Sequence, residues 1–269
     1  MDAPPAPDLP RPFYNEWWGA RRAAARALWD WHTALWHPQV PAGSEVEAYF
    51  DAERARAEAG ERVRGMPEST ATAAYEACAT YDLPREWLGA QVEAARLLHG
   101  PTRFETADRL DTFVRLWAAP HARLLAALAG CTNSVQRSWA DALGRGFFLL
   151  ARLVRLPTDL AQDRLFVPRA ECRKYGVGID QLRTGPATEP LQRLLWTQSV
   201  RVRDALQRGR LLARDLGGRR RYALRWYWHG ALALLEEMQR RDYDLWTEPL
   251  RLSRFRRLEV WLQMLFGRS

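Results

Sequence analysis

The sequence predicts an all-α fold in a single domain. Apolar residues make up 47% of the 269 residues, enough for a sizeable core, and the composition is rich in Ala, Leu and Arg, which favour helix. No segment shows the sustained alternation of apolar and polar residues that strands require. The 13 tryptophans are spread over many segments, as expected for one large helical core rather than one aromatic surface patch.

The first half of the chain places apolar residues at helical spacing between clear stop signals. Leu28, Trp31 and Leu35 recur three or four residues apart, and the prolines that follow end this helix. Ser44, with Glu47 three residues later, is a capping box for the next helix. The helices predicted here span residues 17–36, 44–60, from just after Pro67 to about 82, 85–98 and 102–129.

The second half continues with helices of the same kind. Asn133 or Ser134 can cap a helix that runs to about Leu156. Further helices are predicted at 168–175, 189–215, 219–241 and 251–266. The Pro-rich residues 1–12 have no basic or apolar leader pattern and predict an extended, flexible lead, so that residues 13–269 form the helical domain.

Positive charge is concentrated toward the C-terminus. Residues 201–269 hold sixteen arginines and eight acidic residues, an excess that equals the formal net charge of the whole chain, +8. Such a surface suits anionic lipid headgroups, diphosphates or an acidic protein, and the alternative is a solvated basic face. Because Lys174 is the only lysine, arginine abundance by itself says little about nucleic acid, and without a nucleic-acid motif no such partner is predicted.

The cysteines and the apolar segments predict a cytoplasmic protein. Cys78, Cys131 and Cys172 are odd in number, far apart and without metal-ligand spacing, as expected for reduced thiols. No apolar run approaches the roughly 20 residues that span a bilayer. Together with the basic C-terminal quarter, this predicts a cytoplasmic location, with a peripheral position on the inner face of the membrane as a further expectation.

Several stretches of the chain resemble the squalene/phytoene synthase family. Residues 164–168 read R-L-F-V-P and are followed by Y-G-V at 175–177, which resembles the segment after the family's second aspartate-rich helix. Residues 240–258 resemble the family's C-terminal signature, and weaker similarity runs through 81–85 and 101–106. The resemblance implies an isoprenoid-synthase-type helical bundle around a central cavity.

The family's metal ligands are largely missing from the second motif. In the family, two aspartate-rich segments face each other and hold Mg²⁺ ions that neutralise the substrate diphosphates. The second motif should fall on residues 151, 155 and 159, where the chain has Ala151, Arg155 and Asp159. Asp159 and Asp163, four residues apart, form a remnant that could hold a metal only in a site displaced by one turn, which the positive charge of Arg155 disfavours.

The first motif has also lost its acidic residues. Trp36, His37 and Val40 stand where the family has aspartates, and the histidines His32 and His37 are five apart, so they do not share one helix face. We expect both histidines at the surface or at an interface. No metal site and no cofactor are therefore predicted, and Mg²⁺ enters only if catalysis is retained.

Basic residues lie in and near the second motif, and bulky residues occupy the segment that shapes the family's prenyl channel. Arg155, Arg152 and Arg164, together with Arg145, are candidates for holding an anionic ligand without metal, and surface ion pairing is the alternative. Bulkier side chains occupy the positions that shape the family's prenyl channel, which predicts an altered or filled channel. The candidate cavity-lining residues are Phe113, Trp117, His121 and Phe148.

Two hypotheses for function follow from the resemblance. In the first, the chain is a catalytically degenerate member of the family that acts by binding, in an assembly, chaperone-like or regulatory role near a membrane, with a prenyl diphosphate, another hydrophobic anion or a protein as its partner. In the second, it is an active transferase that condenses two prenyl diphosphates head-to-head with an unusual metal site. The second hypothesis requires carboxylates from other cavity-lining helices, and Glu93, Glu105 and Asp108 are the candidates.

Overall fold

The computed structural model describes residues 13–36, 70–98 and 101–266, together with residues 48, 51–52 and 55. The predicted lead at residues 1–12 and most of the predicted helix at 44–60 lie outside these described residues.

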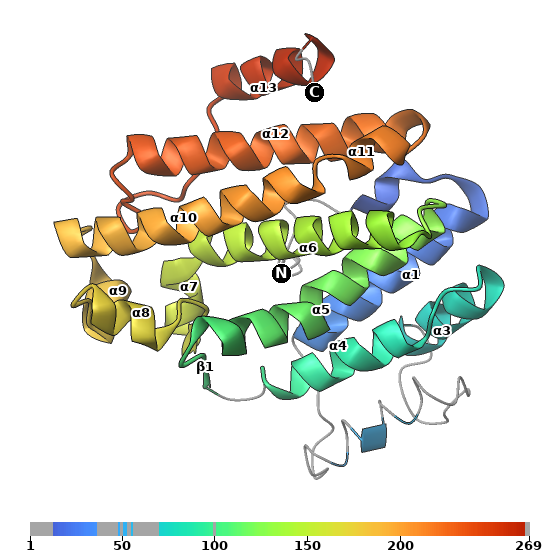
Figure 1. Cartoon of the computed structure of the whole chain (residues 1–269), viewed down its shortest axis with the longest axis horizontal. Coiled ribbons are helices and arrows are strands. Elements are labelled where there is room, and N and C mark those ends of the chain that lie inside the picture. Colours follow the sequence, from blue (N-terminus) through green and yellow to red (C-terminus); the bar gives the residue numbers. More distant parts are fainter. Residues whose placement is uncertain are drawn as a thin grey trace.

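The described residues form an all-α fold, as predicted. The helices are η1 (Phe13–Glu16), α1 (Gly19–Trp36), α3 (Thr70–Thr80), α4 (Glu86–Arg96), α5 (Ala107–Leu128), α6 (Ser134–Val154), α7 (Leu156–Ala161), α8 (Arg169–Lys174), α9 (Ile179–Thr184), α10 (Glu189–Gly209), α11 (Leu212–Asp215), α12 (Gly218–Arg240) and α13 (Arg254–Phe266). Helix α6 occupies the centre and packs against α5 on one side and α10 on the other, while α12 lies beyond α10 and α13 lies on the outer side of α12 (Figure 1).

The start of α5 differs from the prediction. The predicted helix began at residue 102, but the side chain of Thr106 caps α5 by accepting a hydrogen bond from the backbone N–H of Arg109. Residues Thr102–Arg103 instead form β1, which pairs in parallel with β2 (Arg164–Leu165). Each strand has only two residues, too few to produce an alternating pattern in the sequence.

This short strand pair fixes the chain after α7 against the start of α5. Backbone hydrogen bonds from Arg169 to Phe104 and from Ala170 to Glu105, both 2.9 Å long, extend the contact beyond β1 and β2. The segment that resembles the family motif, residues 164–168, is thereby held beside α5. This arrangement positions one wall of the pocket described below.

The junction between α6 and α7 follows from Pro157. Asn133 caps α6 through a complete capping box with Gln136, as predicted for this position. Proline has no backbone N–H and is tolerated only in the first turn of a helix, so Pro157 lies at the start of α7 rather than inside α6. The predicted helix at 189–215 likewise divides into α10 and α11, and α9 was not predicted.

Two glycines allow α6 to approach its neighbours closely. A Cβ at Gly144 would lie 2.7 Å from the backbone oxygen of Ala118 on α5, and one at Gly209 would lie 2.7 Å from that of Trp139 on α6. Close packing of this kind places the central three helices in one continuous apolar core. Among the described helices, none is both long enough and apolar enough to cross a membrane.

Candidate functional site

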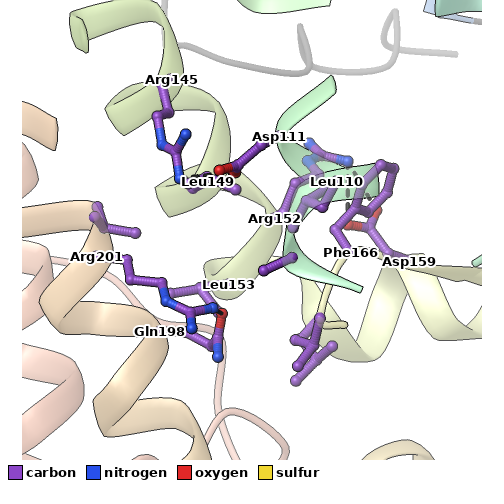
Figure 2. Close-up of a pocket in the computed structure, with 14 residues that line it drawn as sticks. Leu110, Asp111, Arg145, Leu149, Arg152, Leu153, Asp159, Phe166, Gln198 and Arg201 are labelled. Carbon is purple, nitrogen blue, oxygen red and sulfur yellow. Dashed lines mark hydrogen bonds and ion pairs between the residues drawn. The ribbon is translucent and has the colours of Figure 1, made fainter. Parts of the chain in front are cut away.

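A pocket of about 240 Å³ lies between α5, α6, α7 and α10. Leucines of α5 and α6 form its apolar wall, together with Phe166 and Val167 from the segment after β2. The polar residues that line it are Asp111, Arg145, Arg152, Asp159, Gln198 and Arg201. Figure 2 shows that Arg145 and Asp111 point toward one another, that Arg152 lies beside Asp159, and that Gln198 and Arg201 extend from α10.

The most buried polar contact of the pocket is an ion pair between Arg152 and Asp159. Arg152 lies in the last turn of α6 and Asp159 in α7, and their side chains are only 3% and 4% exposed. One guanidinium nitrogen, Nη1 of Arg152, donates to both carboxylate oxygens of Asp159 at 3.0 and 3.1 Å. The pair therefore connects the two helices on either side of the break at Pro157.

Burial dominates the electrostatics of Asp159. Loss of hydration raises the pKa of its carboxyl group from 3.8 to about 6, against the opposing effect of the positive charges on Arg152, Arg155 and Arg164. Three guanidinium groups therefore surround a single buried carboxylate. Such an environment repels a further cation.

Aromatic rings enclose the guanidinium group of Arg152. Its central carbon lies 4.5 Å from the ring centroid of Trp36, 5.6 Å from that of Phe148 and 5.5 Å from that of Phe166. Trp36 stands where the family's first aspartate motif begins, and its indole also lies 5.2 Å from the guanidinium carbon of Arg164. The remaining positions of that motif, residues 37–40, lie outside the described residues.

Two further ion pairs lie at the edge of the pocket. Arg145 of α6 contacts Asp111 of α5 at 2.7 Å, and each side chain is about one-third exposed. Arg201 of α10 pairs with Glu171 of α8, which also accepts a hydrogen bond from Gln198. The described carboxylates that line the pocket, or that bind its lining residues, are thus each matched by an arginine.

The other predicted ligand residues lie outside the pocket. Asp163 adopts a positive φ of 56° and contacts Arg103 and Arg183 instead of joining Asp159 in a metal pair. Arg155 ends α6 and makes no ion pair within the described chain, and Arg164 is half-buried with its Nη1 atom lacking a hydrogen-bond partner. Of the predicted anion-binding arginines, only Arg152 and Arg145 line the pocket.

The aromatic residues expected to line a cavity fill the interior instead. Phe113, Trp117 and Phe148 are 0% exposed and pack in one cluster, with ring centroids 5.7 Å apart for Phe113 and Phe148 and 6.2 Å apart for Phe113 and Trp117. They do not line the pocket described above. Side chains of this size occupy the space that smaller ones would leave open.

His121 and His32 form a buried stacked pair. Their rings lie 4.0 Å apart, and Nδ1 of His32 is 2.7 Å from the side-chain oxygen of Gln91. His32 is only 1% exposed, so its expected surface position is wrong. Burial, followed by the neighbouring His32, holds the pKa of His121 well below its usual range, which keeps that ring neutral. His121 lines a small apolar pocket between α5 and α6.

The carboxylates of the pocket do not fit a Mg²⁺ ion. This cation is bound by one or two carboxylates together with water and phosphate oxygens, whereas both oxygens of Asp159, the buried carboxylate of the pocket, accept hydrogen bonds from Arg152. Within the residues that the structure describes, no group of three or more His, Cys, Asp or Glu side chains could hold a metal ion.

The carboxylates that could have supplied an unusual metal site also lie elsewhere. Glu105 contacts Arg169 and Arg173 at the surface, and Glu93 is 3.7 Å from Arg96. Asp108 is exposed in the first turn of α5, and none of the three lines the pocket.

Sequence reasoning missed Asp111, Gln198 and Arg201. Asp111 directly follows Leu110, a buried residue of α5, which is a weak signal that its side chain borders the core. Gln198 and Arg201 are three apart on α10, but only the packing of α10 against α6 brings them to the pocket. No local pattern could have revealed that contact.

The buried ion pair leads to a prediction about the free energy of unfolding. Arg152→Met leaves the carboxylate of Asp159 buried without its partner, so at neutral pH we expect a loss of about 3–5 kcal/mol in the free energy of unfolding, measured by urea denaturation. Adding Asp159→Asn removes the unpaired charge and should recover most of that loss. As a control, Arg145→Met breaks a partly exposed pair and should cost less than about 1 kcal/mol. A double variant as unstable as Arg152→Met alone would contradict this account.

The raised pKa of Asp159 leads to a prediction about how the free energy of unfolding depends on pH. Its pKa of about 6 in the folded state lies above its ordinary value of 3.8, so between these values the folded protein holds a proton that the unfolded chain has lost. The group therefore stabilises the fold most at low pH, and this contribution disappears as the pH rises through about 6. The free energy of unfolding of the natural protein minus that of Asp159→Asn should fall from pH 4 to pH 7. A difference that rises over this range would show that the arginines outweigh burial.

Comparisons with known proteins agree with this fold. Among solved structures, a squalene synthase, HpnC, from Alicyclobacillus acidocaldarius matches with a TM-score of 0.72 and 25% identity, over 83% of this chain and 84% of that chain. A dehydrosqualene synthase in complex with a ligand matches with a TM-score of 0.73 and 13% identity, over 94% and 89% of the two chains. YisP from Bacillus subtilis matches with a TM-score of 0.63 and 12% identity, over 93% and 88%.

The latter two structures are only 13% and 12% identical to this chain in sequence, so they show a likeness in fold alone. A search of curated proteins finds no significant match. The sequence itself, however, matches the family model for squalene/phytoene synthase over residues 21–257. Because that match covers most of the chain, and the helical fold agrees with it, the chain belongs to the squalene/phytoene synthase family.

Proposed function

We propose that this protein is a family member that binds a hydrophobic anion without condensing two prenyl diphosphates. The observation that supports this proposal is the buried Arg152–Asp159 ion pair beneath Trp36. It lies where the resemblance would put carboxylates free to bind Mg²⁺. Asp159, the remaining acidic residue of the second motif, is instead neutralised by a guanidinium group, and an indole occupies the start of the first motif.

The energetics of ionisation support a loss of catalysis. Cleavage of an allylic diphosphate develops negative charge on the leaving group, and stabilising that charge is the main task of an enzyme of this kind. A metal at Asp159 would have to displace Arg152 from the carboxylate and place a second cation beside a buried guanidinium group, which is unfavourable.

The pocket suits a ligand with an anionic head and an apolar tail. Arg145 and Arg201 are partly exposed at its edge, where guanidinium groups can bind phosphate oxygens directly. Leu110, Leu149 and Leu153 form the apolar wall behind them. The comparison with a squalene synthase at 25% identity favours a prenyl diphosphate as that ligand. The biological role proposed for such binding is assembly, chaperone-like or regulatory, with a protein as the further partner.

Helix α13 supports a place for this protein at an anionic membrane surface. Its outward face carries Phe255, Leu258, Trp261 and Leu262, which are 86%, 54%, 45% and 42% exposed, while Val260 is buried. Exposed arginines accompany this apolar face, as is typical of helices that lie in the interface of an anionic bilayer. They are Arg251, Arg254 and Arg257.

Arg256 has a structural role instead of a membrane-facing one. It is directed back toward the bundle and pairs with Glu236 of α12 and with Glu259 of its own helix. Experiments on membrane binding should therefore leave Arg256 unchanged.

The proposed loss of metal chemistry can be tested by thermal melting. A non-hydrolysable farnesyl diphosphate analogue should raise the melting temperature without Mg²⁺, because it binds only the folded state, and millimolar Mg²⁺ should add nothing. The variant Arg145→Gln/Arg201→Gln should lose this rise, while the matched variant Arg109→Gln/Arg115→Gln, which removes two exposed arginines of α5, should keep it. In parallel, labelled farnesyl or geranylgeranyl diphosphate should yield no squalene or phytoene. A Mg²⁺-dependent rise with product formation would establish the alternative, an active prenyltransferase.

Membrane docking by α13 can be tested with vesicles. The protein should co-sediment with phosphatidylglycerol vesicles but not with phosphatidylcholine vesicles, and added salt should release it. Each arginine near the surface contributes about 1 kcal/mol at low salt, so Arg254→Gln/Arg257→Gln should weaken binding by roughly thirtyfold. The control is again Arg109→Gln/Arg115→Gln. Equal sedimentation of all three proteins, without salt dependence, would identify the basic face as merely solvated.

A further inference from the structure

A second pocket, of about 270 Å³, lies where α10 ends and α12 begins. It is bordered by the end of α10, by α11 and by the first half of α12, and it shares no lining residue with the pocket described above. It therefore does not belong to the site at Arg152 and Asp159.

The charge of this second pocket is entirely positive. Its ten lining residues include Arg210, Arg214, Arg221 and Arg225, and none of the ten is acidic. Arg221 and Arg225 lie one turn apart on α12, where like charges destabilise a helix by roughly 0.2–0.5 kcal/mol. The fold thus gathers four arginines around one cavity.

The arginines are oriented by backbone groups. Arg221 donates from Nε to the carbonyl oxygen of Leu216 at 3.2 Å and from Nη2 to that of Arg214 at 2.6 Å. Among the described residues, the guanidinium group of Arg210 donates to the side chain of Gln207, at 3.5 Å. In the described part of the chain, neither Arg210 nor Arg221 forms an ion pair with a carboxylate, so donor groups stay available for an external anion.

An apolar wall completes the pocket. Leu143 and Leu224 are buried, and the indole of Trp228 is held in place because its Nε1 donates to the carbonyl oxygen of Leu206 at 2.9 Å. His229 lies edge-on to Trp228, with ring centroids 4.8 Å apart. Burial, followed by the charge of Arg225, lowers the pKa of His229, which indicates that a further positive charge is unfavourable there without an anion.

We infer that this second pocket binds a phosphate-type oxyanion. Several guanidinium groups around one cavity provide the charge-assisted hydrogen bonds that such an anion requires, and none of the residues that line the cavity carries a competing carboxylate. The apolar wall leaves room for a phosphate that is attached to a hydrocarbon chain, so the oxyanion can be a free phosphate compound or a lipid headgroup. The inference does not rest on the proposed function of the first pocket.

Calorimetric titration of the full chain tests this inference with two probes at low salt. One probe is inorganic pyrophosphate, and the other is dihexanoyl phosphatidate below its micelle concentration. Binding of either probe should weaken by about tenfold or more in Arg221→Gln/Arg225→Gln, because two charged donors are lost. The probe that binds with the lower Kd identifies the source of the oxyanion: pyrophosphate indicates a free phosphate compound, and phosphatidate indicates a lipid headgroup.

Two controls separate this site from general charge effects and from the first pocket. Arg109→Gln/Arg115→Gln removes the same charge elsewhere and should change the affinity by less than about twofold. Because the first pocket is itself proposed to bind a diphosphate, Arg145→Gln/Arg201→Gln should remove any binding there and should keep the binding that Arg221→Gln/Arg225→Gln loses. Because Arg221 also donates to two carbonyl oxygens of the chain, binding by Arg221→Gln/Arg225→Gln is measured well below the melting temperature of that variant, where circular dichroism shows that it is folded, which excludes unfolding as the cause of lost binding. The absence of binding by both probes, or an equal loss in Arg109→Gln/Arg115→Gln, would overturn the inference.

Discussion

The buried ion pair between Arg152 and Asp159 organises the centre of this protein. It connects the end of α6 to α7. Nη1 of Arg152 donates to both carboxylate oxygens of Asp159, and the described residues provide no other carboxylate contact to this atom. The rings of Trp36, Phe148 and Phe166 pack around the same guanidinium group. A buried charge without its partner costs several kcal/mol, so the contacts around this pair must persist together. In this chain the guanidinium group of Arg152 therefore supplies a positive charge at a position where the family binds metal ions.

The two basic pockets differ in how their charge is balanced. In the first, arginines are matched by carboxylates of the same chain, as in the pairs Arg145–Asp111 and Arg152–Asp159. In the second, the guanidinium groups of Arg210 and Arg221 donate to amide and backbone oxygens within the described part of the chain. An external anion must compete with a carboxylate in the first pocket, whereas in the second it meets no acidic lining residue.

Aromatic side chains of α1, α5 and α6 fill the interior of the bundle. Phe113, Trp117 and Phe148 are fully buried, and the stacked His32 and His121 rings continue this filled region. These side chains fill the interior, and the first pocket lies at the side of α6 toward α10. On the opposite side of α12, the exposed apolar face of α13 remains uncovered within the described chain (Figure 1).

The sequence by itself determined the helical fold and the family, because helix periodicity, caps such as Asn133 and the motif at 164–168 are local signals read along the chain. It also located Asp159 and Arg152, which lie beside that motif. Only the tertiary structure decided that these two residues pair, that His32 is buried and that Arg201 reaches the first pocket. Such contacts join helices far apart in sequence, and the packing of α6 against α5 and α10 that creates them leaves no periodic trace in any one segment.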